Sequence, residues 1–439
     1  MVHSDTFKLQ NVAEPNLYRE MFPYTELPRV QFGHSATVPA GRAWITDTTF
    51  RDGQQARPPY SVQQITDLYT LMSRLDGGSG LIRASEFFLY SPKDREAVDK
   101  CRELGCEYPQ ITGWIRAVKA DFELVKEMKL PETGILTSCS DYHIFLKLKK
   151  DRKQAMEMYL DIARQALDEG IRPRCHFEDL TRADFYGFVV PFAIELMKLR
   201  EEYGLDVKIR LCDTMGYGVP WIKATLPRSV PKLVHRLIRD VGVPGELLEW
   251  HGHNDFYKAL SNSATAWLHG CGAVNTTLLG IGERTGNTPL EAMVVEAAQL
   301  CGMNEKVNYP VITEIARYYS ENIGYAIPHN LPLVGRDFNI TRAGIHADGL
   351  LKNDEIYSAF DTQKILNRRI GVAITDKSGA AGIQYWLESH YGMNLGKNDA
   401  RLLAIRDLID REYGAGRTTA ISDEEMHAWY SKTFTTKEV

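Results

Sequence analysis

The chain has 439 residues, of which 44% are hydrophobic, 25% charged and 10% aromatic, which is typical of a folded globular enzyme. Its formal net charge of −5 is small and the signs are interspersed, which argues against a nucleic-acid partner. Seven scattered cysteines without a Cys-Xaa-Xaa-Cys pair favour reduced thiols. The sequence shows neither a signal-peptide profile nor an apolar run of about 18 residues, so we expect a cytoplasmic protein with no membrane partner.

Residues 1–42 are rich in proline and polar side chains and predict an irregular N-terminal extension. Residues 43–303 alternate short apolar segments with amphipathic helical patterns, in the way expected of a (β/α)₈ barrel of roughly 250 residues. A doubly wound sheet fits less well, because no glycine-rich turn follows the first strand. The predicted strands cover residues 44–48, 82–88, 110–114, 134–138, 173–177, 207–212, 247–251 and 273–279, and helices are expected at 63–75, 94–104, 152–169 and 191–202.

The alternation of short apolar segments with helical patterns ends after residue 303. Helical patterns at residues 311–323, 399–413 and 423–432 alternate with a glycine-bearing segment, NITRAGIHADGLLKN, and a second glycine cluster, DKSGAAG. We expect the first of these segments to be a loop. Residues 304–439 are therefore predicted to form a mainly helical C-terminal subdomain.

Polar residues gather where strands of the predicted barrel end, which is where catalytic residues of such barrels lie. The segment DTTFRDGQQ places Asp52 after the first strand, and HGHNDF places His251 and His253 at the end of the seventh. The two histidines share one face of their strand, because side chains alternate along a strand. Strands seven, eight and one are neighbours in a closed barrel, so all three side chains can converge. One carboxylate and two imidazoles suit a catalytic divalent ion, although each could alone be a helix cap or a buried hydrogen-bonded residue.

Three segments, DTTFRDGQQ, HGHNDF and GIGERTGN, together resemble the signatures of the DRE-TIM metallolyase family. Its members include isopropylmalate synthase, homocitrate synthase, Re-type citrate synthase and the hydroxymethylglutaryl-CoA lyases. The resemblance implies that Asp52, His251 and His253 are metal ligands and that Asn287 lies near or on the metal. It also implies that Arg51 stabilises a developing oxyanion, the alternative being a structural salt bridge.

The resemblance assigns further roles outside the metal site. Glu86 and Glu178 match pocket glutamates, and Thr214 matches a threonine that holds the carboxylate of an oxo acid. His346 matches the catalytic histidine of the synthases, supplied by the region after the barrel, and we expect it to transfer protons together with Glu178. The alternative is that His346 is an ordinary loop residue.

The implied reaction is a metal-dependent Claisen condensation of acetyl-CoA with a 2-oxo acid, followed by hydrolysis of the thioester. Lyases of the family carry a cysteine in the loop after strand eight, whereas this chain has LLGIGERTGN there, which favours a synthase. Most relatives follow the histidine motif with a small turn, but here it reads Phe-Tyr-Lys-Ala, which we expect to form the first turn of the next helix. This departure makes the chain most similar to the citrate and homocitrate synthase branch of the family. The same similarity is seen in the segments WIRAVKADFELVKE and SDYHIFLKLKKDRKQAME.

A dicarboxylic oxo acid needs a second cationic or hydrogen-bonding group in the pocket. Arg116 and His143 are the candidates, with Arg210 of uncertain facing; the arginines could instead pair with outer helices and His143 could cap one. We expect oxaloacetate as the acceptor, which gives citrate, with 2-oxoglutarate or 2-oxoisovalerate as alternatives. The ligand types permit Mn²⁺, Mg²⁺, Co²⁺ or Zn²⁺, and relatives of this type form homodimers.

Overall fold

The computed structural model describes residues 9–32 and 43–434 and divides the chain into two compact units. The first spans Phe32–Ile340 with Leu366–Ile370, and the second spans Met1–Gln31, Thr341–Ile365 and Gly371–Val439. The predicted extension at residues 1–42 lies partly outside the described residues, which omit 1–8 and 33–42. No described helix combines the length and apolar content that crossing a membrane requires.

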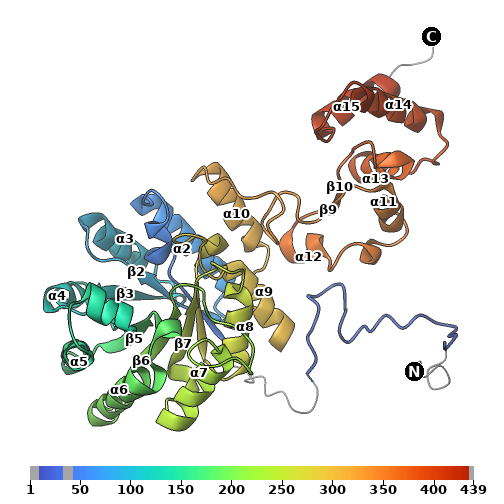
Figure 1. The fold of residues 1–439 in the computed structure, drawn as a ribbon. Coiled ribbons are helices and arrows are strands. Elements are labelled where there is room, and N and C mark those ends of the chain that lie inside the picture. Colours follow the sequence, from blue (N-terminus) through green and yellow to red (C-terminus); the bar gives the residue numbers. More distant parts are fainter. Residues whose placement is uncertain (1–8, 33–42, 435–439) are drawn as a thin grey trace. The chain divides into compact units, whose positions relative to one another are not determined.

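Eight parallel strands of the first unit close into a barrel in the order β1 to β8, which confirms the predicted (β/α)₈ fold (Figure 1). Closure occurs where β8 pairs with β1, with Ala273 opposite Trp44 and Thr276 opposite Asp47. The strands are β1 (Trp44–Asp47), β2 (Ile82–Phe87), β3 (Gln110–Arg116), β4 (Glu132–Ser138), β5 (Arg172–Glu178), β6 (Lys208–Asp213), β7 (Leu248–Gly252) and β8 (Ala273–Thr276).

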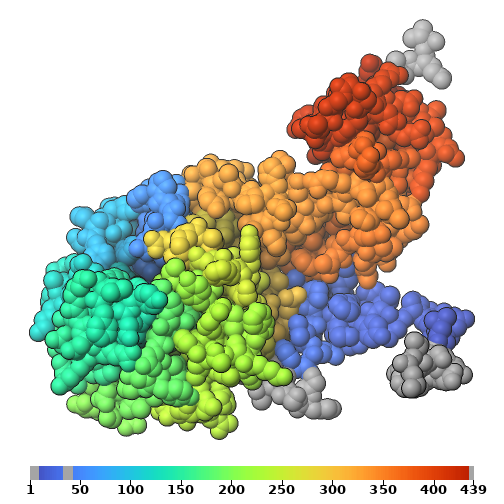
Figure 2. Space-filling model, viewed as in Figure 1, coloured from blue at the N-terminus to red at the C-terminus, as the bar shows by residue number. Residues whose placement is uncertain are grey.

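Helices surround the strands of this barrel (Figure 1), and the space-filling view shows the same side of the protein with its side chains (Figure 2). Several begin at sequence-coded caps: Ser61 and Ser91 each form a capping box at the start of α2 and α3. The α-helices are α1 (Asp52–Gln55), α2 (Val62–Asp76), α3 (Pro92–Glu103), α4 (Lys119–Glu127), α5 (Arg152–Asp168), α6 (Val190–Tyr203), α7 (Val230–Arg236), α8 (Ala259–Leu268), α9 (Leu290–Cys301) and α10 (Val311–Glu321). Short 3₁₀ and π helices are η1 (Tyr142–Lys147), η2 (Leu180–Arg182), η3 (Phe185–Val189), η4 (Leu237–Val241), η5 (Gly245–Leu247) and η6 (Leu278–Gly280).

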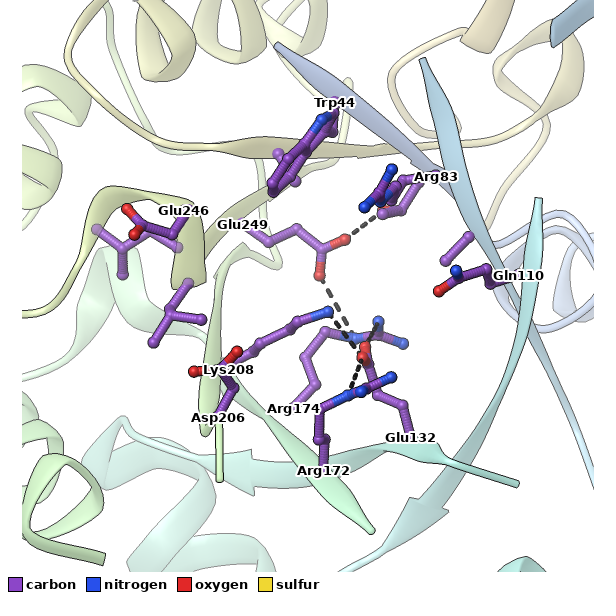
Figure 3. A pocket seen from close by; sticks show the side chains of 15 residues that line it. Trp44, Arg83, Gln110, Glu132, Arg172, Arg174, Asp206, Lys208, Glu246 and Glu249 are labelled. Carbon is purple, nitrogen blue, oxygen red and sulfur yellow. Dashed lines mark hydrogen bonds and ion pairs between the residues drawn. The ribbon is translucent and has the colours of Figure 1, made fainter. Parts of the chain in front are cut away.

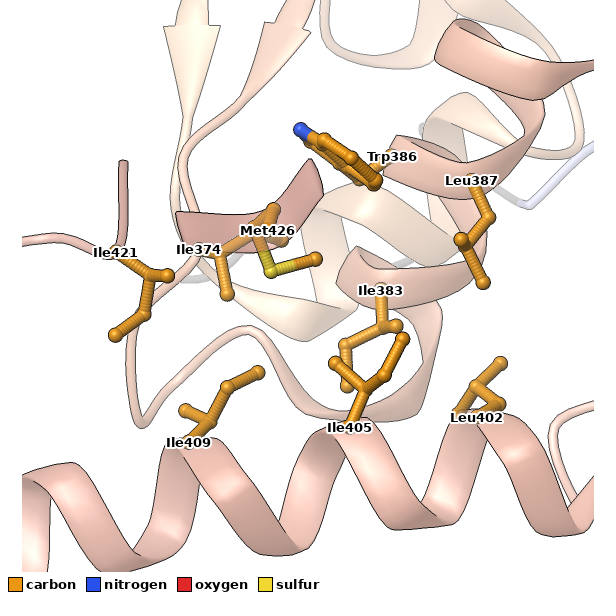
Figure 4. Close-up of a cluster of buried hydrophobic side chains, with 9 residues drawn as sticks. All are labelled: Ile374, Ile383, Trp386, Leu387, Leu402, Ile405, Ile409, Ile421 and Met426. Atoms are coloured by element: carbon orange, nitrogen blue, oxygen red, sulfur yellow. The ribbon is translucent and has the colours of Figure 1, made fainter. Parts of the chain in front are cut away.

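The second unit is mainly helical, as predicted, and has its own hydrophobic core. Ile383 and Leu387 of α13 face Ile405 and Leu402 of α14, with Trp386 beside Leu387 (Figure 4). The elements after α10 are β9 (Ile340–Thr341), α11 (Gly344–Leu350), η7 (Asp354–Ile356), α12 (Thr362–Leu366), β10 (Gly371–Val372), α13 (Gly379–Tyr391), α14 (Ala400–Gly414) and α15 (Asp423–Phe434).

The segment expected to be a glycine-bearing loop contains a helix, so that prediction was wrong for its central part. Gly344–Leu350 form α11, and His346 therefore lies on a helix. A Cβ on Gly344 would lie 2.7 Å from the backbone oxygen of Ser378, so this glycine permits close packing.

Candidate active site

Asp52, His251 and His253 meet at the C-terminal end of the barrel strands. The Nε2 atoms of the two histidines are 3.1 Å apart, and Oδ2 of Asp52 lies 3.5 and 3.6 Å from them. All three side chains are buried. Within residues 9–32 and 43–434 they form the one group of three such side chains whose ligand atoms could hold a metal ion, all lying within 4.8 Å of one another.

Asn275 of β8 determines which nitrogen of His251 is available. Its amide nitrogen donates to Thr46 Oγ1 at 2.9 Å, so its carbonyl oxygen accepts from Nδ1 of His251 at 2.7 Å. Burial and the neighbouring His253 lower the pKa of His251 to about 3, so the imidazole is neutral. Its proton lies on Nδ1 and the lone pair of Nε2 points into the group, as a metal ligand requires.

Asp52 supplies the negative charge of this group. Burial alone would raise its pKa, but Arg51 and the two histidines outweigh burial and hold the pKa below its ordinary value. Asn287 donates from its amide nitrogen to Oδ2 of Asp52 at 2.8 Å. The close approach of Asn287 depends on Gly282, where a Cβ would lie 1.6 Å from Oδ1 of Asn287. An ionised carboxylate beside two imidazoles fits a divalent ion.

Arg51 lies between Glu86 and the candidate metal-binding group of Asp52, His251 and His253. Its Nε donates to Oε1 of Glu86 at 3.0 Å, and its Nη1 is 3.4 Å from Oδ1 of Asp52. The guanidinium carbon lies 5.1 Å from the ring centroid of Trp114, within the range of a cation–π contact. The charge of Arg51 is therefore held in place next to the candidate metal-binding group.

Glu86 is enclosed by cations inside the barrel. The carboxylate is 1% exposed, and burial alone would raise its pKa, but the surrounding positive charges hold the pKa well below its ordinary value. The structure thus places this predicted pocket glutamate where it orients Arg51. Its partners are Thr48 (3.0 Å), Arg51 (3.0 Å), Arg174 (2.7 Å), Arg210 (2.9 Å) and His176 (3.3 Å).

A second polar group forms where β4 and β5 end. Oε2 of Glu178 lies 2.9 Å from Nδ1 of His143, and Lys147 and the hydroxyl of Ser138 also contact this carboxylate. Burial would raise the pKa of Glu178, but the hydrogen bond and charge of His143, with Lys147, lower it to about 2. Thr214 follows β6, and its hydroxyl accepts from the backbone N–H of Asp179 at 2.8 Å.

Two other predicted site residues have different surroundings. Arg116 ends β3 with 62% of its side chain exposed, and pairs with Asp121 of α4 through two contacts of 2.8 and 2.9 Å. His346 lies in the second unit, where its ring is 4.2 Å from that of Tyr357 between centroids. The sequence left open which side of its strand Arg210 occupies. The structure buries Arg210 fully inside the barrel, where it contacts Glu86 and Glu249.

Some residues of the site were missed from the sequence. Asn275 is paired in register with His251, so strand pairing was the signal that could have revealed it. Arg284 of the GIGERTGN loop donates to Asp255 at 2.8 Å and to the backbone oxygen of Thr214 at 2.6 Å, which joins three loops.

The predicted first turn at Phe-Tyr-Lys-Ala was wrong, because α8 begins only at Ala259. Tyr257 adopts a positive φ of 56° and is 94% exposed. Lys258 turns back and donates to the backbone oxygen of Phe256 at 3.1 Å.

Comparison with known proteins agrees with the predicted synthase. The chain is 60% identical to the Citrate (Re)-synthase of Syntrophus aciditrophicus, covering 96% of this chain and 68% of that one. It is 52% identical to the Citrate (Re)-synthase of Clostridium kluyveri, covering 97% of this chain and 95% of that one. Identity to the 2-phosphinomethylmalate synthase of Streptomyces hygroscopicus is 39%, covering 98% and 99%. The expected citrate-forming activity is thus the one for which the first two relatives are named.

A solved structure and a family model complete the comparison. The HMG-CoA lyase of Bacillus subtilis shares the fold, with a TM-score of 0.51 at 19% identity, covering 65% of this chain and 95% of that one. The HMGL-like family model matches residues 42–318. These matches confirm the family resemblance indicated by the three sequence segments, and the chain therefore belongs to the HMGL-like family.

Proposed function

We propose that this enzyme condenses acetyl-CoA with oxaloacetate and hydrolyses the resulting thioester to citrate and CoA. The main support is the convergence of Asp52, His251 and His253 beside Arg51, in a chain 60% identical to a Citrate (Re)-synthase. A dicarboxylic acceptor needs a further hydrogen-bonding group, and His143 at the same end of the barrel is the proposed one.

The metal-binding group and Arg51 would act on the keto group of oxaloacetate. A divalent ion held by Asp52, His251 and His253, with Mn²⁺ or Mg²⁺ proposed ahead of Co²⁺ or Zn²⁺, would supply positive charge that polarises the keto group. Arg51 adds a guanidinium that keeps its proton throughout the reaction. Because Glu86 and Trp114 fix its position, Arg51 needs no reorganisation to stabilise the alkoxide oxygen as negative charge develops.

The condensation also requires a base for the methyl group of acetyl-CoA. Loss of a methyl proton gives an enolate, whose carbon attacks the keto carbon; the alkoxide then gains a proton, and water cleaves the thioester to release CoA. A carboxylate with a pKa near 2 is a weak base, so we assign proton removal to His346 and give Glu178 an electrostatic role. Thr214 and His143 are the proposed contacts for the carboxylates of the oxo acid.

We further propose that the enzyme acts in the cytoplasm as a homodimer and binds acetyl-CoA and a 2-oxo acid, without a nucleic-acid or membrane partner. The mild net charge of −5 supports the absence of a nucleic-acid partner. The assignment of His346 rests on the sequence resemblance, because it belongs to the second unit.

The test is a CoA-release assay with acetyl-CoA and Mn²⁺ or Mg²⁺, run in parallel against oxaloacetate, 2-oxoglutarate and 2-oxoisovalerate. We expect the highest kcat/KM with oxaloacetate. Preference for 2-oxoglutarate or 2-oxoisovalerate would contradict the proposal in favour of another synthase of the family. Citrate made from labelled acetyl-CoA, degraded by a lyase of known stereospecificity, then identifies the face of oxaloacetate that is attacked. His346→Ala should abolish turnover while metal binding persists.

A further inference from the structure

His176 is a buried histidine inside the barrel to which no role has been assigned. It lies on β5, two residues after Arg174 and two before Glu178, so the three side chains share the interior face of the strand. Only 2% of the His176 side chain is exposed. Barrel interiors of this kind are usually filled by branched aliphatic side chains. A buried polar ring is stable there only where its nitrogens have partners, so these partners indicate what His176 does.

The first partner of His176 is Trp114 of β3. The indole Nε1 donates to Nδ1 of His176 at 3.3 Å. An indole N–H can only donate, so Nδ1 is the unprotonated nitrogen of the imidazole. Burial, together with the positive charge of Arg210, lowers the pKa of His176 to about 3. The ring is therefore neutral and carries its proton on Nε2.

The second partner of His176 is Glu86 of β2. The protonated Nε2 lies 3.3 Å from Oε2 of Glu86. Among the described residues this nitrogen has no aligned hydrogen bond, so its N–H acts on Glu86 through electrostatic attraction. The two side chains meet over Gly134 of β4, where a Cβ would lie 2.6 Å from Nε2 and 2.8 Å from Oε2. Any side chain at position 134 would therefore separate His176 from Glu86.

Glu86 is also held from the end of the barrel where the strands begin. Nη2 of Arg174 donates at 2.7 Å to Oε2 of Glu86, the oxygen that faces His176. Nη1 of Arg174 donates to Glu132 at 2.7 Å, and Lys208 donates to the same carboxylate at 2.7 Å, beside a pocket at this end (Figure 3). These paired charges fix Oε2 of Glu86 and leave its Oε1 directed towards the active site.

Trp114 and Glu86 are the two residues that hold Arg51. Oε1 of Glu86 accepts from Nε of Arg51 at 3.0 Å, and the guanidinium carbon lies 5.1 Å from the ring centroid of Trp114. His176 contacts the indole N–H and the other carboxylate oxygen of the same two residues. Arg51, Trp114, His176 and Glu86 therefore form a closed ring of contacts, although they come from four different parts of the barrel.

We propose that His176 is a positioning residue that fixes Arg51, through Trp114 and Glu86, in the orientation that stabilises the alkoxide oxygen. The inference rests on the proposed function, because that function gives Arg51 this task. A fixed guanidinium needs no reorganisation when negative charge develops. Without His176 the guanidinium is free to turn towards Asp52, whose Oδ1 lies 3.4 Å from its Nη1.

Steady-state kinetics of the full-length enzyme with acetyl-CoA, oxaloacetate and Mn²⁺ tests the proposal. We expect His176→Leu to lower kcat about 10- to 100-fold and to change KM for oxaloacetate less than about three-fold, because the lost interaction acts in the transition state. Its metal content should equal that of the wild type. His176→Gln, whose amide can accept from Trp114 and donate towards Glu86, should recover most of kcat.

Variants of tryptophan provide a second route and a control. Trp114→Phe keeps an aromatic ring beside Arg51 and removes only the N–H that His176 accepts, so it should lower kcat about 3- to 10-fold. It replaces His176→Leu if that variant fails to fold. Trp267→Phe is the matched control, because Nε1 of Trp267 is buried on α8 without a hydrogen-bond partner in the described part of the chain. It should keep the kcat of the wild type.

A double-mutant cycle shows whether His176 acts through Arg51. In an Arg51→Gln background, His176→Leu should lower kcat by less than about two-fold more, because no guanidinium remains to be positioned. An equal loss in both backgrounds would overturn the proposal, and so would a wild-type kcat in both His176→Leu and Trp114→Phe. A wild-type enzyme that releases no CoA with oxaloacetate would instead contradict the proposed function, and this inference with it.

The tautomer of His176 is a measurement that needs no turnover. In ¹⁵N NMR spectra of histidine-labelled enzyme, His176 is assigned by the signals that His176→Leu lacks. We expect Nε2 to be protonated and Nδ1 to be unprotonated at about pH 7, and Trp114→Phe to shift the Nδ1 signal. A proton on Nδ1 would exclude the hydrogen bond from Trp114 and overturn the proposal.

Discussion

Nδ1 of His143 lies 2.9 Å from Oε2 of Glu178, which joins the ends of β4 and β5 at the mouth of the barrel. Ser138 and Glu178 are paired in register at the ends of these strands. His143 lies in the short π helix η1 that follows β4, and its ring is therefore close enough to contact Glu178. The contact keeps a carboxylate ionised beside an imidazole in the proposed substrate pocket. Arg116 is instead paired with Asp121 of α4.

Because His143 lies in the proposed substrate pocket whereas Arg116 is paired with Asp121, we expect His143 to recognise the oxo acid. His143→Asn should lower kcat/KM for oxaloacetate by about 10- to 100-fold, the effect of losing a hydrogen bond to a charged group. Arg116→Gln should change it by less than about three-fold, because an exposed pair contributes little. Steady-state kinetics of the two variants checks this. A large effect of Arg116→Gln with a negligible effect of His143→Asn would instead assign recognition of the oxo acid to Arg116.

The loss of a proposed metal ligand should be detectable from the metal content of the enzyme, without an activity assay. We expect the chelated and reconstituted enzyme to hold about one divalent ion per chain, and His251→Ala to bind it more than about 100-fold more weakly. Elemental analysis after equilibrium dialysis measures both. His235→Ala is the control, since His235 is exposed on α7. Unchanged metal content in His251→Ala would refute the proposed site.

Asn275 should influence metal affinity although it does not belong to the group of three. Its carbonyl oxygen holds the proton of His251 on Nδ1, so Asn275→Ala should weaken metal binding by about 10- to 100-fold. Asn275→Asp keeps an acceptor at this position and should recover most of the affinity. The same dialysis experiment reports both variants, and equal affinity of Asn275→Ala and the wild type would contradict the prediction.

Glu291 of α9 should make stability depend on pH. Burial raises its pKa to about 7 from the ordinary value of 4.5, so the folded state holds a proton that the unfolded state has lost. Stability therefore falls as the pH rises from about 4.5 towards 7, by up to about 3 kcal/mol at pH 8.

Glu291→Gln removes this charge and keeps an oxygen for the backbone N–H of Leu279, which donates to Glu291 at 3.1 Å. We expect the variant to be more stable than the wild type at about pH 8 and nearly equal to it at about pH 5, as measured by urea unfolding. An equal shift at both pH values would show that the effect comes from packing and not from ionisation.

Local sequence patterns determined the barrel and the meeting of its proposed metal ligands. Alternation along a strand puts His251 and His253 on one face, and closure of the barrel makes β7, β8 and β1 neighbours. Both rules depend only on the period of a strand and on the order of the elements. For this reason the convergence of Asp52 with the two histidines could be predicted without coordinates.

The tertiary structure alone decided the charged interior and the role of Gly344. β4 begins at Glu132, before the predicted strand, because a charged residue there is buried against Arg174 and Lys208 of other strands, which no apolar pattern can reveal. The chain near Ser378 approaches Gly344 so closely that a Cβ there would lie 2.7 Å from the backbone oxygen of Ser378. Such contacts join residues far apart in the sequence, so their energies depend on the closed fold and not on local propensity.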